Sequence, residues 1–210
     1  MKSFSELANE YAKLDKRSVG YLPLYEMLFT PIRMEAKKIL EIGVQSGKSI
    51  TLLRDFFENA QIHGWDIDPS CRRNDNRISI DILNHDNKCD VISNLEKIGN
   101  DIDIIIDDGS HRMNSQQCLL AWCLKYVKSG GIYVTEDIGT SFHVMGKNYG
   151  LNHNGSNSTY KCLNEFIHSG KFNSEYVTKE EKTYIENNTK HVFIFSTLRN
   201  HPDDYHNLST

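Results

Sequence analysis

The sequence has 210 residues and a formal net charge of −4, a length that suits one domain with its own hydrophobic core. This charge offers no broad basic surface, so we expect no nucleic-acid partner. The five cysteines are odd in number and none is spaced as CxxC, which indicates a reducing compartment with neither a disulfide framework nor a structural zinc site. No run approaches the roughly 18 apolar residues of a membrane span, and the first residues are too polar for a signal peptide. We therefore expect a cytoplasmic protein without a membrane partner.

The first part of the chain, residues 1–37, predicts a helical leader. Ser3 and Glu6 have the spacing of a capping box, which predicts a short first helix. A second helix is predicted from Tyr21 to Phe29, ended by the break at Pro31. We expect both helices to pack on the main sheet.

Residues 38–138 alternate strand and helix patterns, which predicts a Rossmann-like, doubly wound α/β core with a mostly parallel sheet. Its first unit, LEIGVQSGKS, places Gly43 and Gly47 between a buried strand and a helix, where backbone can approach a ligand closely. This loop matches neither the phosphate-binding GxxxxGK[ST] nor the dinucleotide GxGxxG pattern. Glu41, inside the strand, needs a specific partner because an unpaired buried carboxylate is costly.

Acidic residues also end the next two predicted strands, at Asp66 and at Asp81. In nucleoside-binding α/β folds, a carboxylate at the end of the second strand accepts the ribose hydroxyls. Asp66 lies 19 residues beyond Gly47, close to the spacing of about 20 in such folds. The alternative is an Asx turn that leads into Pro69.

The stretch DIDIIIDDGSH, residues 101–111, carries the strongest chemical signal. Its uninterrupted isoleucines predict a strand buried on both faces, so Asp107, Asp108 and His111 would lie at the carboxyl edge, where open α/β sheets bind ligands. The next strand, predicted over 132–135, ends in Glu136 and Asp137. The alternative is that Asp107 and Asp108 only cap a helix and make a turn with Gly109.

The remaining elements are predicted from periodicity. Helices are expected over 86–98 and 113–127, and 139–160 forms a long loop of the kind that is often functional. For 161–200 we predict a helix and then a β-hairpin, with strands at 181–186 and 191–197. The segment HPDDYH, 201–206, is expected to be a solvated tail, with metal binding as the alternative.

Four strings, LEIGVQSGKS, GWDIDP, DIDIIIDDGSH and GGIYVTEDIGTS, occur in this order. Together they resemble the class I S-adenosylmethionine-dependent methyltransferases, and among them the Mg2+-dependent sugar O-methyltransferases of macrolide biosynthesis. The leader is also similar, although Lys13 and Leu14 replace the Gly and Thr of the family's GTDK, and Val19 replaces the His of its HGY. The resemblance implies a seven-stranded sheet that ends in an antiparallel hairpin. The macrolide enzymes carry a further N-terminal domain, so their assembly and acceptor preference do not transfer to these 210 residues.

The resemblance implies a role for each matching position. Residues that would line the S-adenosylmethionine site are Glu41, Gly43 and Gly47 at the methionine moiety, Asp66 at the ribose, Asp81 near the adenine, and Asp107 on the cofactor side. Residues that would hold Mg2+ are Asp108, Glu136 and Asp137, with His111 as the general base.

The implied activity is Mg2+-dependent O-methylation of a hydroxyl on a sugar, a sugar-bearing small molecule or a glycan precursor. Clustered carboxylates suit a hard divalent ion, which lowers the pKa of a hydroxyl while a neutral imidazole takes its proton. The expected partner is therefore a small-molecule or carbohydrate acceptor, and a homo-oligomer stays open.

Three other functions compete with this hypothesis. Related sequences are named cephalosporin hydroxylases, which would place different chemistry on the same fold. A catalytically silent S-adenosylmethionine-binding or oligomer-scaffolding protein is a second alternative. A nicotinamide-dependent enzyme is the least favoured, because the glycine fingerprint does not match.

Overall fold

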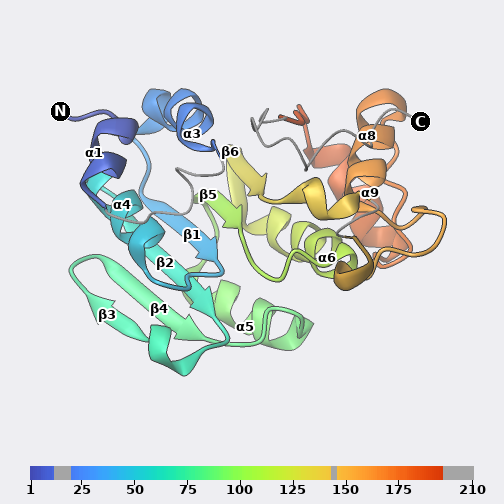
Figure 1. The fold of residues 1–210 in the computed structure, drawn as a ribbon, viewed down its shortest axis with the longest axis horizontal. Helices are drawn as coiled ribbons and strands as arrows, with labels where there is room; N and C mark the ends of the chain where they lie inside the picture. Colours follow the sequence, from blue (N-terminus) through green and yellow to red (C-terminus); the bar gives the residue numbers. More distant parts are fainter. Residues whose placement is uncertain (12–19, 143–145, 196–210) are drawn as a thin grey trace.

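The computed structural model describes residues 1–11, 20–142 and 146–195 of the chain. Within them lies a six-stranded sheet in the order β3-β4-β2-β1-β5-β6 (Figure 1). The parallel strands are β1 (Lys38–Ile42), β2 (Gln61–Asp66), β4 (Ile78–Ile82), β5 (Ile102–Asp107) and β6 (Val127–Thr135). The short β3 (Arg73–Asp75) pairs antiparallel with β4. Because five strands run in the same direction, their carboxyl ends share one edge of the sheet.

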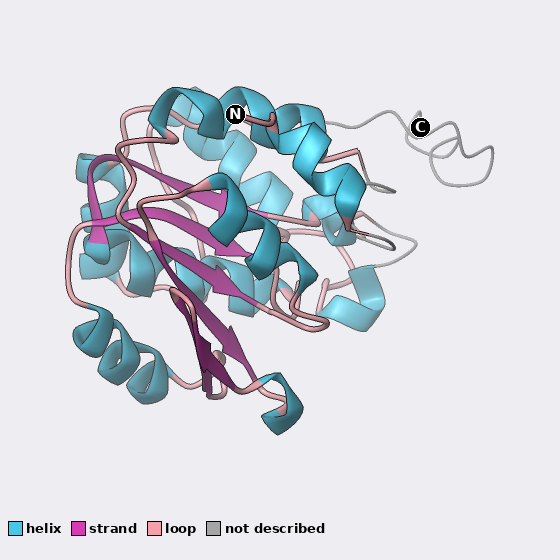
Figure 2. Ribbon diagram, turned by 90° about the vertical axis from the view of Figure 1, so that its left-hand side faces the viewer, coloured by secondary structure: helices cyan, strands magenta, loops and turns pink. Residues whose placement is uncertain are grey.

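Helices cover both faces of the sheet, which confirms the predicted doubly wound α/β architecture (Figure 2). One face packs against α1 (Phe4–Glu10), α3 (Leu22–Phe29) and α4 (Lys48–Phe56), and the other against α5 (Lys88–Ile98) and α6 (Met113–Cys123). Beyond α6 lie α8 (Thr159–Ser169) and α9 (Lys179–Asn188), which form a third apolar cluster with it. Short 3-10 turns are η1 (Thr30–Ile32), η2 (Pro69–Cys71), η3 (Leu124–Tyr126), η4 (Ile138–Ser141) and η5 (Lys147–Tyr149).

Strand β5 lies inside the sheet between β1 and β6, and all six of its residues are buried. Ile104 and Ile106 join the core on the α1–α3–α4 side, whereas Ile105 joins the core on the α5–α6 side. A strand with apolar cover on both faces needs no polar alternation, as predicted from its isoleucine run. This strand therefore delivers Asp107 and the residues after it to a fixed place at the carboxyl edge.

The N-terminal leader is held on the sheet by aromatic packing. Helix α1 begins with the predicted capping box of Ser3 and Glu6. Phe4 makes edge-on contact with Tyr25, with ring centroids 5.8 Å apart, and Tyr25 stacks on Phe29 at 4.7 Å. Aromatic pairs of this kind add about 0.5–1.5 kcal/mol beyond area burial. The packing fixes α3 relative to the sheet.

The predicted C-terminal hairpin is wrong. Residues 181–186 lie in α9, which begins with a capping box between Thr178 and Glu181, and residues 191–195 form no strand. The capping box and the buried Ile185 favour a helix over the weak alternation that suggested a strand. The described residues therefore give six strands rather than seven, and 196 and 197 lie outside them.

Two further boundaries differ from the prediction. The helix expected over 113–127 ends at Cys123, and β6 begins at Val127, so Gly130 and Gly131 lie within the strand. A register shift against β5 between Ile102 and Ile104 accommodates them. The leader positions 13–16 and 19 and the tail 201–206 lie outside the described residues.

All five cysteines are free. In the part of the chain that the structure describes, no helix has both the length and the apolar character needed to cross a bilayer.

Gly43 follows β1 at the point where the backbone after β5 comes closest to it. Its φ is +88°, and a Cβ at this position would lie 2.1 Å from the carbonyl oxygen of Asp108. The Asp108 amide donates to the carbonyl oxygen of Ile42 at 2.9 Å, which holds the two strand ends together. Glycine is therefore required here for both backbone conformation and space.

We expect Gly43→Ala to lower the free energy of unfolding by roughly 3 kcal/mol or more, from the left-handed φ and from overpacking together. Gly130→Ala is the matched control, because Gly130 also has a positive φ of +81° but no atom within 4 Å of a Cβ. The control should lose only about 1–2 kcal/mol. Equal losses in urea unfolding would show that the close approach to Asp108 is not a constraint.

Candidate active site

The glycine loop between β1 and α4 is pinned by Asp66 at the end of β2. Asp66 Oδ2 accepts the amides of Val44 and Gln45 at 2.9 and 2.8 Å, and Oδ1 accepts the amide of Asp68 at 2.9 Å. Burial alone would raise the pKa of this carboxyl, but the three amide donors hold it below its usual range. Asp66 is therefore a charged anchor for the loop as well as a predicted ribose ligand.

Three further predicted cofactor residues lie in β1, in β4 and at the start of α4. Gly47 is the N-cap of α4 with φ +73°, and open space lies where its Cβ would be. Glu41 is fully buried and accepts a hydrogen bond from the hydroxyl of Ser49 in the first turn of α4. Asp81 is half-buried on β4, opposite Trp65 of β2. The glycine loop thus presents bare backbone at a helix N-terminus.

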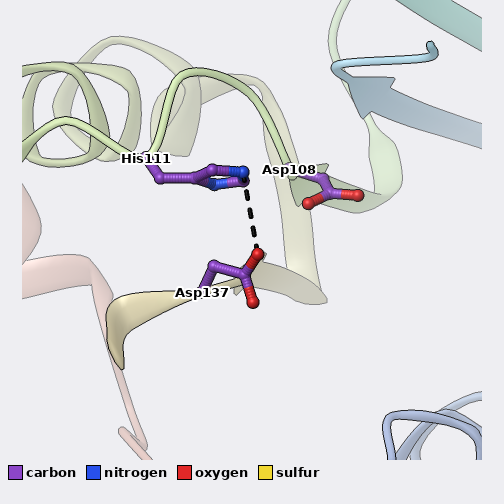
Figure 3. Close-up of side chains that lie close together, drawn as sticks. All are labelled: Asp108, His111 and Asp137. Carbon is purple, nitrogen blue, oxygen red and sulfur yellow. Dashed lines mark ion pairs between the residues drawn. The ribbon is translucent and has the colours of Figure 1, made fainter. Parts of the chain in front are cut away.

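Three side chains meet at the ends of β5 and β6. Asp108, His111 and Asp137 each offer one ligand atom, and these atoms all lie within 4.8 Å of one another. His111 Nε2 is 3.7 Å from Asp137 Oδ2, and Asp108 approaches the same space from the other side (Figure 3). Asp108 and Asp137 are 29 positions apart in the sequence, and the parallel pairing of β5 with β6 brings them together. Two carboxylates and an imidazole at this separation can hold a divalent ion or move a proton.

Two of these three residues have a left-handed backbone conformation that is uncommon for residues other than glycine. The φ angles are +55° at His111 and +54° at Asp137. The hydroxyl of Thr140 lies 3.0 Å from each of the carbonyl oxygens of His111 and Asp137, which links the two turns. Backbone strain of this kind costs about 1–3 kcal/mol per residue and is often found at functional sites.

Glu136, the third predicted metal ligand, is not part of this cluster. Its side chain is only 4% exposed and accepts a hydrogen bond from the hydroxyl of Tyr25 on α3. Its carbonyl oxygen accepts from the side-chain amide of Gln116 at 3.0 Å. The structure thus groups Asp108 and Asp137 with His111, and turns the carboxylate of Glu136 toward the leader.

Tyr21 makes the corresponding contact with Asp137. Its hydroxyl donates to Asp137 Oδ1 at 2.5 Å and accepts from the backbone amide of Asp137 at 3.1 Å. Burial, and then the Asp137 carboxylate, raise the pKa of Tyr21, so the phenol stays protonated and donates. From the sequence, Tyr21 and Tyr25 were predicted only to lie in a helix. Their four-residue spacing, which puts both on one face of a helix, was the available signal.

Buried polar atoms without a partner gather in the same region. Among the described residues they include Ser110 Oγ, His111 Nδ1 and Gln116 Oε1, all in the connection from β5 to α6 or its first turn. Both ring nitrogens of His85 are also buried without a hydrogen-bond partner, although Nε2 lies 4.0 Å from Asp86 Oδ1. The His85 ring lies 3.1 Å from where a Cβ on Gly109 would be. Buried polar atoms normally have partners, so this grouping is typical of a site that binds a polar ligand. No sequence pattern singled out His85.

The 139–160 loop borders the site. The ring of Tyr149 in η5 lies 6.3 Å from that of His111, between centroids. A cavity of about 340 Å³ in this loop is lined by Lys147, Leu151, Asn152 and His153. Loop residues therefore lie close to the histidine of the cluster.

Residues 40–138 match the family described as a methyltransferase domain. This stretch runs from β1 to just beyond Asp137, so it contains the glycine loop and the whole Asp108–His111–Asp137 cluster.

Relatives and a solved structure extend this likeness beyond residues 40–138. An 8-demethyl-8-alpha-L-rhamnosyl tetracenomycin-C 2'-O-methyltransferase of Streptomyces olivaceus is 30% identical over 129 residues, which are 58% of this chain and 34% of the relative. The mycinamicin VI 2''-O-methyltransferase of Micromonospora griseorubida is 30% identical, over 58% of this chain and 32% of its own. A structure of the MycE methyltransferase from the mycinamycin pathway, in complex with Mg and SAH, has a TM-score of 0.76 and 25% identity, and covers 92% of this chain and 51% of its own. The chain spans about a third of the length of these curated relatives.

Asp107 is the buried last residue of β5 and directly precedes Asp108 of the cluster. Burial raises its pKa to about 7, and the charges of Asp108 and Asp86 add to this shift, whereas the Gly109 amide, 3.3 Å from Oδ1, opposes it. A carboxyl whose folded-state pKa lies above its unfolded value of 3.8 holds its proton more tightly when folded. The stability that it contributes is complete below the unfolded pKa and is lost as the pH rises toward 7.

We therefore expect the unfolding free energy of the wild-type protein, relative to Asp107→Asn, to fall from about pH 5 to pH 7 and then to level off. Urea unfolding in the presence of a chelator measures this difference without interference from a metal at Asp108. A difference that stays constant over this range would mean that Asp107 is already ionised at pH 5.

Proposed function

We propose that this chain carries out S-adenosylmethionine- and divalent-metal-dependent O-methylation of a hydroxyl on a sugar, a sugar-bearing small molecule or a glycan precursor. The observation that carries the proposal is the position of the Asp108–His111–Asp137 cluster beside the glycine loop, at one edge of the sheet. Relatives named as sugar O-methyltransferases, and a similar structure with Mg and SAH, support it. The proposed acceptor is a small molecule or carbohydrate.

The glycine loop fits the proposed cofactor. Gly43 and Gly47 leave backbone exposed at the N-terminus of α4, and Asp66 holds the loop in this shape. Asp66 lies at the carboxyl end of β2 next to this loop, where we propose that it contacts the ribose hydroxyls. S-adenosylmethionine, when bound, supplies the methyl group. The residues proposed to line its site are Glu41, Gly43, Gly47, Asp66, Asp81 and Asp107.

The acidic edge fits a hard divalent cation. Asp108 and Asp137 offer carboxylate oxygens to one space, and Glu136 precedes Asp137 directly. Oxygen ligands of this kind suit Mg2+. A bound cation would polarise the acceptor hydroxyl and lower its pKa. We propose Asp108, Asp137 and Glu136 as its ligands.

His111 is the proposed general base. Its Nε2 lies 3.7 Å from Asp137 Oδ2, so the Asp137 carboxylate would stabilise the imidazolium that forms on proton transfer. In the proposed step the hydroxyl oxygen forms a bond with the methyl carbon while the carbon–sulfur bond breaks, and the hydroxyl proton passes to His111 Nε2. The backbone of His111, tied through Thr140 to that of Asp137, keeps this nitrogen in place.

The direct test is transfer of a labelled methyl group from S-adenosylmethionine to a panel of free and glycoside-linked sugars. We expect transfer with Mg2+, loss of transfer in excess chelator, and recovery when Mg2+ is restored. Full activity in chelator would contradict the metal role. Absence of transfer to every acceptor, together with cofactor binding, would favour the silent binding protein instead.

His111→Ala should lower turnover by about 10²–10⁴-fold, because it removes the base. Affinity for S-adenosylhomocysteine, measured by calorimetry, should stay within a few-fold of wild type, because the glycine loop is unchanged. His168→Ala is the control, since His168 is exposed near the end of α8 and its Nδ1 lies 2.7 Å from the carbonyl oxygen of Asn164 in the same helix. Near-normal turnover of His111→Ala would remove the assignment of the base.

A further inference from the structure

We propose that helix α3 is part of the metal site, and that Tyr21 and Tyr25 are positioning residues that orient the carboxylates of Asp137 and Glu136. This inference rests on the proposed function, since it assigns a role in metal binding to residues of the leader. Figure 1 shows α3 next to β6, whose end carries both acids. Helix α3 lies outside the residues 40–138 that match the methyltransferase domain.

Tyr21 determines which oxygen of Asp137 faces the cluster. Its hydroxyl donates to Oδ1 at 2.5 Å, and the other oxygen, Oδ2, lies 3.7 Å from His111 Nε2. The same hydroxyl accepts the Asp137 amide at 3.1 Å, so one phenol holds both the side chain and the backbone of Asp137. This backbone contact also stabilises the left-handed φ of +54° at Asp137.

Tyr25 holds the carboxylate of Glu136 from one helical turn further along. Its hydroxyl donates to Glu136 Oε1, and the tyrosine is only 1% exposed. Its ring stacks on Phe29 and meets Phe4 edge-on. The phenol is therefore held in one place by its packing and cannot leave Glu136 unless α3 moves.

The position of α3 is itself fixed by a charged contact. The carboxylate of Glu26, the residue directly after Tyr25, accepts the backbone amides of Phe4 and Ser5 at 3.2 and 2.8 Å. These amides belong to the first turn of α1, where an acidic partner is favourable. Helices α1 and α3 are thus packed together, and this packing helps to hold the two phenols in place.

Hydrogen bonds behind metal ligands orient the ligands, and their loss typically weakens metal affinity by 10–100-fold. Here the donors belong to the leader and the acceptors belong to the domain core. Binding of a cation should therefore stabilise the packing of α3 against the core. Loss of that packing should weaken cation binding by the same factor. The leader would then contribute to the proposed metal site directly.

The test is Mn2+ affinity of the full chain, measured by the electron paramagnetic resonance signal of the free ion. We expect Tyr21→Phe and Tyr25→Phe each to lower the affinity for Mn2+ by about tenfold or more. Tyr11→Phe is the matched control, because Tyr11 also donates to a carboxylate, that of Asp55, but away from the acidic pair. The control should bind Mn2+ as the wild type does.

A second readout needs no metal. Because Tyr21 sets the orientation of Asp137 toward His111, Tyr21→Phe should shift the imidazole nitrogen resonances of His111 in metal-free protein, whereas Tyr11→Phe should not. Wild-type Mn2+ affinity in both tyrosine variants would overturn the inference and leave the proposed function standing. If the wild type itself binds no Mn2+, the proposed metal role fails, and the His111 resonances alone decide whether Tyr21 positions Asp137.

Discussion

Negative charge concentrated at one buried edge of a sheet has to be matched by donors, and the rest of this structure is arranged around that constraint. Four of these carboxylates receive donors of three kinds. Asp66 accepts three backbone amides, Glu41 a serine hydroxyl, and Glu136 and Asp137 the phenols of α3. For Asp107 the Gly109 amide lies 3.3 Å from Oδ1, and burial raises the pKa of this carboxyl to about 7. Burying a carboxylate without such partners would cost several kcal/mol.

These donors connect separate parts of the chain to one site. The amides on Asp66 shape the glycine loop, and the phenols bind the leader to the end of β6. Thr140 ties the loop after β6 to the turn that carries His111. A change in any one of these contacts therefore affects the cluster, although only three residues form it. The proposed chemistry depends on this shared edge more than on any one element.

The sequence predicted the core of the site because strand ends are easy to recognise. An uninterrupted isoleucine run specifies a strand buried on both faces, and parallel strands carry their terminal acids to one edge. Asp108, His111 and Asp137 could therefore be grouped before any coordinates were known. The role of Glu136 as a ligand stays a prediction, because its carboxylate faces Tyr25.

Features that depend on docking were harder to predict. Tyr21 and Tyr25 lie 116 and 111 positions before their partners, and nothing in the local pattern of α3 indicates where that helix will pack. The strand expected over 181–186 failed for a local reason, since a capping box at Thr178 starts a helix there. The three-residue β3 is too short for periodicity to detect.

The central claim is that the edge formed by the glycine loop and the acidic strand ends binds the methyl-donor cofactor beside a metal. Calorimetric titration of the full chain with S-adenosylhomocysteine, with and without Mg2+, tests it most directly. We predict saturable binding near one molecule per chain in both conditions. No binding in either condition, from protein that circular dichroism shows to be folded, would contradict the account.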